Sequence, residues 1–132
     1  MTDQQAATDL IRFRAGDLHA IRRIVGDHAT AAGADPERTA DIVLAVNEAV
    51  TNAIEHGGGA GTVWFRARET PLVIEVSDSG AGYVEPSAGT AAPAPTSRRG
   101  RGIWLIRQLS EQVEIRSGIR GTIVRMHLPV IP

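Results

Sequence analysis

The feature that most constrains the fold is the stretch Asp41–His56, which has the residue spacing of one amphipathic helix. Its apolar residues recur at steps of three and four and therefore share one face of a helix. They are Ile42, Val46, Ala49, Val50 and Ala53. Asp35 followed by Pro36 is typical of a helix start, and the glycines from Gly57 onward are typical of a helix end. The sequence therefore predicts a long helix with one buried face that ends at Gly57.

Another face of this helix carries polar side chains in a column. Glu48, Asn52 and His56 are four residues apart, so they project in the same direction, with Thr51 and Glu55 beside them. Polar residues occupy the solvated face of an amphipathic helix by default. The other interpretation is functional, because a carboxylate can accept a proton and a carboxamide oxygen is a ligand that Mg²⁺ prefers. The helix by itself does not decide between the two.

The composition is that of one soluble globular domain, which we assign to residues 1–132. Of the 132 residues, 42% are hydrophobic and 22% are charged. The chain contains no cysteine, which excludes a disulfide framework and a thiolate zinc site. No run of apolar residues approaches the roughly 18 that a membrane span needs. We therefore expect a cytoplasmic protein that does not bind membranes.

The charge of the chain excludes two further classes of function. The formal net charge is −1, which argues against broad nucleic-acid binding by neutralisation of phosphates. All of the 14 Lys and Arg residues are arginines, so lysine is absent. A mechanism that depends on a P-loop lysine is therefore excluded.

Periodicity along the chain groups the strands apart from the helices. Alternation or helical spacing predicts, in order, a strand, two helices, a hairpin of two strands, a helix and a second hairpin. The helix that precedes the long one begins at Asp17, which we expect to cap it. These elements are residues 10–14, 18–33, 36–56, 62–68, 72–77, 103–109, 112–117 and 122–128. The order favours an α+β two-layer sandwich, with a mixed or mostly antiparallel sheet and three helices on one face.

Residues 83–99 show no periodicity and are rich in alanine, proline, serine, threonine and glycine. A segment of this length without its own secondary structure is usually a functional lid or a disordered insert. We interpret it as a mobile lid. We also expect it to be protected from hydrogen exchange when a ligand binds.

The motif Asp78-x-Gly80-x-Gly82 follows the apolar strand at 72–77. A carboxylate at the end of a strand can accept a hydrogen bond from an amino group, such as that of adenine, and glycines leave room for a flat ring. A plain turn after a strand explains the same three residues. The motif alone therefore permits a binding site without requiring one.

A second glycine motif, Gly100-x-Gly102, opens the helix at 103–109. Backbone N–H groups and the helix dipole at such an N-terminus favour phosphate. Arg98, Arg99 and Arg101 surround the motif, although a solvated basic patch would have the same composition. Gly121-Thr122 near the end of the chain is favoured as a hairpin turn.

Taken together, these motifs resemble the GHKL superfamily of ATPases, and within it the small anti-sigma factor serine/threonine kinases of the RsbW type. Glu48-x-x-x-Asn52 is similar to the N box of that family, and Asp78-x-Gly80-x-Gly82 to its first glycine box. Gly100-Arg101-Gly102-Ile103 is similar to the second glycine box, and Gly121-Thr122 to the last. The resemblance covers residues 10–128, and the ordered set is far more specific than any single motif.

The resemblance implies the Bergerat ATP-binding fold, with ATP and Mg²⁺ as cofactors. By this resemblance, Asn52 would bind Mg²⁺, Glu48 would be the catalytic base and Asp78 would hold the adenine amino group. Residues 83–102 would form the lid over ATP. The remaining cofactor-binding positions would be Gly80, Gly82, Arg98, Arg99, Gly100, Arg101, Gly102 and Thr122.

The resemblance also implies partners. Members of this type form homodimers, bind a sigma factor and phosphorylate a serine on an anti-sigma factor antagonist of the STAS type. A second hypothesis is a module that binds ATP and controls a partner without phosphoryl transfer. A third, the catalytic part of a histidine kinase, is disfavoured because the residues before Leu10 do not supply a helical phosphoacceptor region.

Overall fold

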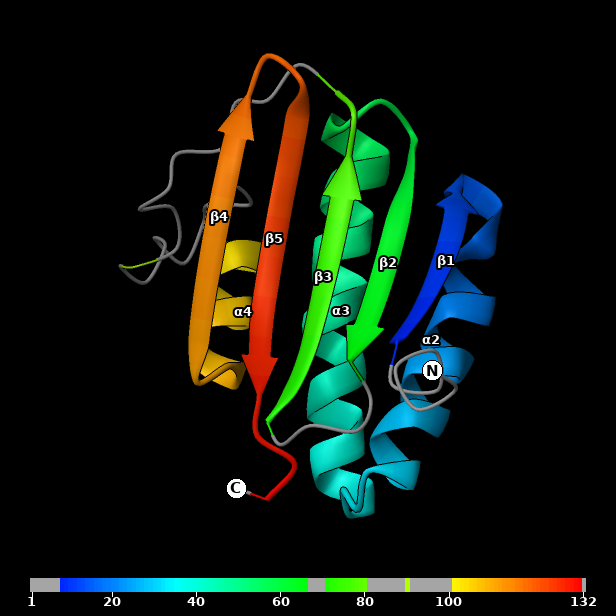
Figure 1. Ribbon diagram of the computed structural model, residues 1–132, viewed down its shortest axis with the longest axis vertical. Helices are drawn as coiled ribbons and strands as arrows, with labels where there is room; N and C mark the ends of the chain where they lie inside the picture. Colours follow the sequence, from blue (N-terminus) through cyan, green and yellow to red (C-terminus); the bar gives the residue numbers. More distant parts are fainter. Residues whose placement is uncertain (1–7, 67–70, 81–89, 91–100, 132) are drawn as a thin grey trace.

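The computed structural model of the protein describes residues 8–66, 71–80, 90 and 101–131. Within these residues the chain forms one sheet and one layer of helices (Figure 1). The elements in chain order are β1 (Thr8–Arg14), the 3-10 helix η1 (Ala15–Asp17), α2 (Leu18–Ala31), α3 (Pro36–His56), β2 (Ala60–Arg66), β3 (Leu72–Asp78), α4 (Arg101–Leu109), β4 (Gln112–Gly118) and β5 (Gly121–Leu128). The predicted α+β class is therefore confirmed.

The sheet has the strand order β1-β2-β3-β5-β4, and each neighbouring pair is antiparallel. A mixed or mostly antiparallel sheet was predicted, and the described strands are all antiparallel to their neighbours. β1 lies at one edge and β4 at the other. The predicted hairpin at 62–68 and 72–77 corresponds to β2 and β3, although β2 already begins at Ala60.

The three α-helices cover one face of this sheet, as the two-layer prediction requires. α3 packs against both α2 and α4 and also against strands β2, β3 and β5. Figure 1 views the molecule from the opposite side, with the strands in front and the helices behind them. We call the face of the sheet without helices the open face.

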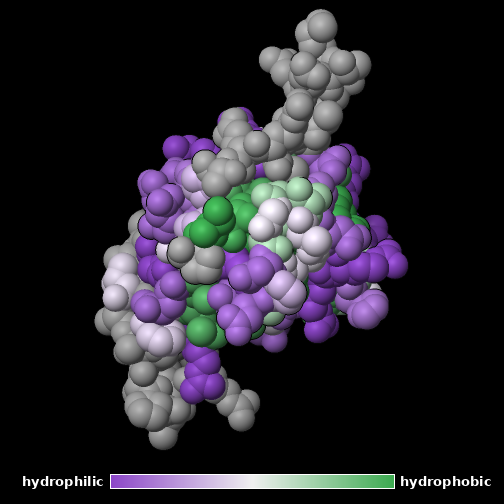
Figure 2. All heavy atoms as spheres, turned by 90° about the horizontal axis from the view of Figure 1, so that it is seen from below, coloured by the Kyte–Doolittle hydropathy of each residue, from purple (hydrophilic) through white to green (hydrophobic). Residues whose placement is uncertain are grey.

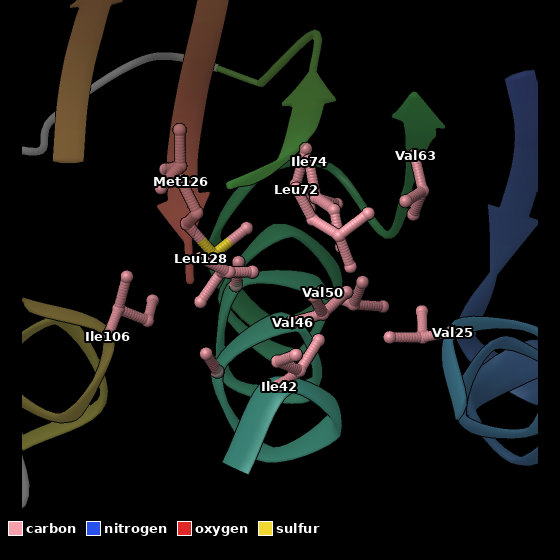
Figure 3. Close-up of a cluster of buried hydrophobic side chains, with 14 of the residues drawn as sticks. Val25, Ile42, Val46, Val50, Val63, Leu72, Ile74, Ile106, Met126 and Leu128 are labelled. Carbon is pink, nitrogen blue, oxygen red and sulfur yellow. The ribbon is translucent and has the colours of Figure 1, made fainter. Parts of the chain in front are cut away.

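The core lies between the sheet and the helices and follows the alternation of the strands. Leu72, Ile74 and Val76 of β3 are buried, and the residues between them are only partly buried. Leu72 and Ile74 point toward apolar side chains of the central helix, among them Val46 and Val50 (Figure 3). Burying one side chain of this kind contributes about 1.5–3 kcal/mol. The apolar face predicted for the long helix is therefore what holds the two layers together.

The start of α3 follows the prediction. The Asp35 side chain accepts a hydrogen bond from the backbone N–H of Arg38 at 2.7 Å, and Pro36 is the first helical residue. The start of α2 does not. Asp17 precedes α2, but its carboxylate accepts the backbone N–H of Arg14 at 2.9 Å instead of an N–H of the helix. A 3-10 turn between β1 and α2 brings that N–H within reach, and the local sequence did not predict this turn.

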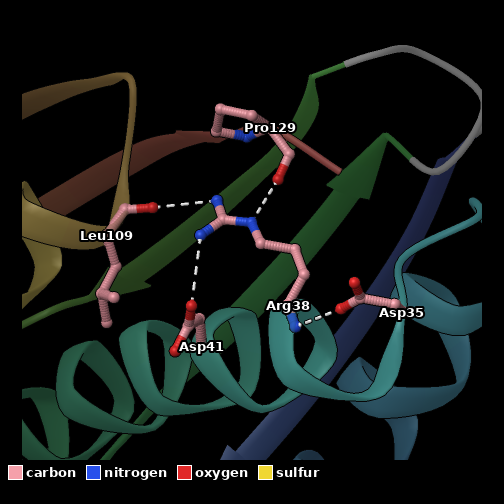
Figure 4. A network of polar contacts seen from close by, with 5 residues as sticks. All are labelled: Asp35, Arg38, Asp41, Leu109 and Pro129. Atoms are coloured by element: carbon pink, nitrogen blue, oxygen red, sulfur yellow. Dashed lines mark hydrogen bonds and ion pairs between the residues drawn. The ribbon is translucent and has the colours of Figure 1, made fainter. Parts of the chain in front are cut away.

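Arg38 is the most buried charged residue described, with 7% of its surface exposed. Its Nε donates a hydrogen bond to the carbonyl of Pro129, and one terminal nitrogen donates to the carbonyl of Leu109 at 2.9 Å (Figure 4). The other terminal nitrogen lies 3.8 Å from the carboxylate of Asp41. One guanidinium group thus joins the start of α3, the end of α4 and the segment after β5.

The surface is mainly hydrophilic in the view from below, with several hydrophobic areas between the hydrophilic side chains (Figure 2). The C-terminus lies at this end of the molecule, and Ile131 is 76% exposed. None of the helices described here combines the length and the apolar character that would let it cross a membrane.

Candidate functional site

Asp78, the last residue of β3, lies where several glycines approach its carboxylate and backbone. Its Oδ1 accepts the backbone N–H of Gly80 at 3.0 Å. A Cβ on Gly57, directly after α3, would lie 2.7 Å from this oxygen. A Cβ on Gly80 would lie 2.6 Å from the Gly57 Cα, and one on Gly121 would overlap the backbone of Asp78. The glycines therefore allow three segments to come close to Asp78.

Thr122 is the neighbour of Asp78 in the sheet, because the two residues are paired in the register of β3 and β5. Paired residues project from the same face of a sheet, so both side chains point toward the helices. Thr122 is buried, and its Oγ1 lies 2.8 Å from the Oγ of Ser117. The structure thus brings together two of the predicted site residues at one end of the sheet.

A second group forms between α3 and the beginning of α4. A Cβ on Gly102 would lie 3.1 Å from Oε2 of Glu48 and 3.6 and 3.7 Å from the two terminal atoms of Asn52. Glu48 and Asn52 are one turn apart on α3, and both are only partly buried. The polar column of the long helix therefore faces the N-terminus of α4 at these two residues. At Glu48 and Asn52, this column is therefore not simply the solvated face of the helix.

The N-terminus of α4 gives this group its chemical character. α4 begins at Arg101 and runs for nine residues. The first backbone N–H groups of a helix lack acceptors within the helix, and with the helix dipole they favour anions such as phosphate. The absence of a side chain at Gly102 lets this helix end approach Glu48 and Asn52 closely. A carboxylate, a carboxamide and the N-terminus of a helix thus meet at one place.

Several of the predicted site residues lie outside the part of the chain that the structure describes. Gly82, Arg98, Arg99 and Gly100 lie outside the described residues, as does the predicted lid at 83–99 except for Thr90. The predicted site residues that the structure describes are Glu48, Asn52, Asp78, Gly80, Arg101, Gly102 and Thr122. They are spread over the sequence from residue 48 to residue 122, and they lie in the second half of α3, at or just after the end of β3, and at the starts of α4 and β5.

Two glycines adjoin this site that were not among the predicted site residues. Gly57 was expected to end a helix and Gly121 to form a turn, and both do so. Gly57 also lies against the Asp78 carboxylate, and Gly121 has φ of +126° beside the Asp78 backbone. A non-glycine residue rarely adopts that φ. A glycine directly after a helix or between two strands gives the same sequence pattern whether or not a binding site lies beside it. The sequence therefore did not identify these two glycines as site residues.

Comparison with known proteins places this geometry in a family. The sequence profile described as histidine kinase-like ATPase domain matches residues 11–128. The anti-sigma F factor of Clostridium acetobutylicum is 35% identical over 90 residues, which are 61% of this chain and 62% of that protein. The anti-sigma F factor of a Thermoanaerobacter species is 36% identical over 110 residues, which are 74% of this chain and 76% of that protein.

Solved structures show the same fold. The histidine kinase domain of a blue-light activated histidine kinase from Erythrobacter litoralis has a TM-score of 0.55 and 26% identity, and the match covers 94% of this chain and 68% of that one. The catalytic domain of the histidine kinase ThkA has a TM-score of 0.56 and 16% identity, and the match covers 94% of this chain and 99% of that one. Since the profile spans nearly the whole sequence, the chain belongs to the histidine kinase-like ATPase domain family.

Proposed function

We propose that the protein binds ATP with Mg²⁺ in this site and transfers the γ-phosphoryl group to a protein hydroxyl. The observation that carries the proposal is the meeting of Glu48 and Asn52 with the glycine at the start of α4. Phosphoryl transfer needs positioned phosphates and a group that accepts the proton of the attacking hydroxyl. The three elements of this group match those needs.

Asp78 would bind the adenine ring. Its Oδ1 already accepts one N–H, that of Gly80, and a carboxylate has further lone pairs for an exocyclic amino group. A side chain at position 57 would meet this carboxylate, and one at position 80 would meet Gly57, so the two glycines keep side chains of their segments out of this region. Thr122, on the neighbouring strand, would lie beside the base.

The residues at the other end of the site fit a magnesium ion that is held jointly with phosphate. Asn52 offers a carboxamide oxygen, and the start of α4 offers backbone N–H groups for the phosphates. When bound, Mg²⁺ would offset the charge of the phosphate oxygens. Glu48 would accept the proton of the attacking serine or threonine hydroxyl, while the bond to the ADP oxygen breaks.

We further propose that the chain acts as an anti-sigma regulatory factor. The relatives at 35% and 36% identity are named anti-sigma F factors. By analogy, this chain would sequester a sigma factor and phosphorylate a serine or threonine of an anti-sigma factor antagonist. The test is incubation with γ-labelled ATP, Mg²⁺ and an antagonist-type domain. Label on a serine or threonine of that domain supports the kinase, whereas ATP binding without labelled protein supports a module that regulates without phosphoryl transfer.

Asp78→Asn is expected to weaken ATP binding by about 1–3 kcal/mol. The change replaces one acceptor oxygen by an NH₂ donor that would face the adenine amino group, itself a donor. Isothermal titration calorimetry measures the affinity, and Asp27→Asn on the exposed side of α2 is the matched control. An unchanged Kd in Asp78→Asn would remove this carboxylate from the site.

Gly57→Ala is expected to weaken ATP binding by about tenfold, or ~1.4 kcal/mol, without unfolding the protein. Gly57 has φ of −106° and ψ of 27°, which alanine adopts. The new Cβ would displace the Asp78 carboxylate, which is the end of a side chain and can move. Gly118→Ala, which meets nothing within 4 Å, is the control in the same titration. A lower melting temperature with an intact Kd would show that Gly57 matters for packing alone.

A further inference from the structure

The open face of the sheet carries side chains in rows that run across the strands. The register of the four strand pairs places one row near the end of the sheet where β3 ends. From β1 to β4 this row consists of Arg12, Thr62, Ser77, Ile123 and Arg116. With neighbouring strands ~4.8 Å apart, the row spans ~19 Å. It has an arginine at each end and short or apolar side chains between them.

This row forms the floor of two adjoining hollows of about 560 and 510 Å³, which share Ser77 and Asp78. We call the two hollows together the trough. Thr62 and Ser77 have short side chains and Gly61 beside them has none, so the side chains here extend only a short distance from the sheet. The side chains of the next row extend further from the sheet, because this row contains Trp64 and the ion pair of Glu75 with Arg125. The trough therefore crosses the sheet beside a wall of larger side chains.

The charge of the trough differs from that of the protein as a whole. Arg12, Arg116 and Arg120 line it and are exposed, and none has a side-chain hydrogen bond or ion pair with another described residue. In contrast, Arg125 in the next row lies 2.7 Å from Glu75. The chain has a net charge of −1. Three arginines without a side-chain partner among the described residues thus lie at one surface of an almost neutral molecule.

The acidic residues of the trough do not cancel this charge. Asp17 lines one hollow, but its carboxylate accepts the backbone N–H of Arg14. The carboxylate of Asp78 is directed to the other side of the sheet, against Gly57 and Gly80. The trough therefore offers guanidinium groups for carboxylates that come from outside.

An apolar contact lies at one end of the trough. Ile119, at the turn between β4 and β5, is 93% exposed and lines the second hollow together with Ile123 and Arg120. A large side chain exposed to this extent beside basic groups suits a ligand that has both acidic and apolar side chains.

We propose that the trough docks an extended acidic segment of a partner protein, with an apolar side chain of that segment against Ile119. An extended chain rises ~3.3 Å per residue, so about six residues span the row. Carboxylates of the segment would pair with Arg12 at one end and Arg116 and Arg120 at the other. The hydroxyls of Thr62 and Ser77 lie between these ends and can bond to its backbone. The row of side chains lies on the opposite face of the sheet from the side chain of Asp78 in the proposed ATP site.

The next row disfavours two other occupants. Glu75 and Glu114 lie there, and they would repel the continuous phosphates of a nucleic acid. A second copy of the chain would have to supply free carboxylates from the same face. Glu75 is already paired with Arg125, and Glu114 with His127 at 3.1 Å.

The test is fluorescence anisotropy at low ionic strength with a fluorescein-labelled peptide of about ten residues, which exceeds the span of the row. In this peptide, glutamates alternate with small residues around one leucine. We expect saturable binding, weakened about tenfold in Arg12→Gln/Arg116→Gln, since two exposed ion pairs with the peptide are lost. Ile119→Ser is expected to weaken binding without a change in charge. ATP affinity is expected to stay the same in both variants.

The control variant is Arg22→Gln/Arg23→Gln, which removes the same charge from the exposed side of α2. Equal loss of binding in this control, or equal binding of a peptide with glutamine in place of glutamate, would overturn the proposal. Tighter binding of a single-stranded oligonucleotide would assign the trough to nucleic acid instead. Sedimentation that shows a dimer in the wild type and a monomer in Arg12→Gln/Arg116→Gln would assign it to self-association.

Discussion

Glu48→Gln is expected to bind Mg²⁺-ATP with nearly the wild-type affinity but to transfer phosphate about 10²–10⁴-fold more slowly, as is usual when a general base is lost. Glutamine keeps the size of the side chain and its hydrogen bonds, but its amide does not take up a proton at neutral pH. Glu48 lies beside Gly102, at the helix end where the phosphates would bind. Binding and catalysis should therefore separate, with calorimetry for the first and labelled phosphate on the antagonist serine for the second.

Asn52→Ala is the comparison that gives this experiment its meaning. It removes the proposed magnesium ligand one turn further along α3, so ATP binding itself should be lost in the presence of Mg²⁺. If Glu48→Gln transferred phosphate at the wild-type rate, the base would have to be another group. The column on α3 would then be a binding surface without a role in proton transfer.

The parts of the fold that were predicted from the sequence are those whose signal is local. The start of α3 needs only Asp35 and Pro36, and both act within the first turn. The strands show alternation because one face is buried. Where the structure describes them, their predicted bounds lie within two residues of the observed ones, with the largest differences at Thr8 and Ala60. The predicted end of one strand at residue 68 lies outside the described residues. Patterns of this kind depend on neighbours along the chain, which a sequence displays directly.

The contacts that form the site depend instead on residues that are far apart in sequence. Gly57 and Asp78 meet because α3 and β3 end at the same side of the molecule. Gly102 meets Glu48 because α4 packs against α3. The sequence motifs indicated which residues could act together, and only the fold shows how they are brought together. The trough is a further case, since its row exists only in the register of five strands.

Arg38 shows the same limit for stability. An arginine in the first turn of a long amphipathic helix is usually solvated, and nothing in the neighbouring sequence distinguishes this one. Its partners are the carbonyl groups of Leu109 and Pro129, 71 and 91 residues away. The end of a helix leaves carbonyl groups without partners inside the helix. Arg38 donates to one such carbonyl, that of Leu109 at the end of α4, and also to the carbonyl of Pro129 just after β5.

Arg38→Ala is expected to lower the free energy of unfolding by about 3 kcal/mol, since two hydrogen bonds from a charged donor are lost and two carbonyls are left without it. The side chain is 7% exposed, so water replaces these bonds only if the structure opens. Arg38→Lys should recover part of the loss, because one ammonium group does not reach both carbonyls in the fixed geometry of a guanidinium. Urea denaturation, with the midpoint compared at constant slope, measures the change.

Two further variants separate the carbonyl contacts from the ion pair. Asp41 is half exposed and lies 3.8 Å from Arg38, so Asp41→Ala should cost less than about 1 kcal/mol. Arg23→Ala, on the exposed side of α2, should stay within about 0.5 kcal/mol of the wild type. A loss in Asp41→Ala equal to that in Arg38→Ala would mean that the carboxylate is the partner that matters. With a small loss in Asp41→Ala and a large one in Arg38→Ala, the carbonyls of Leu109 and Pro129 are what fixes α4 beside α3. Arg38 would then also hold Gly102 in place against Glu48 and Asn52, at the other end of α4.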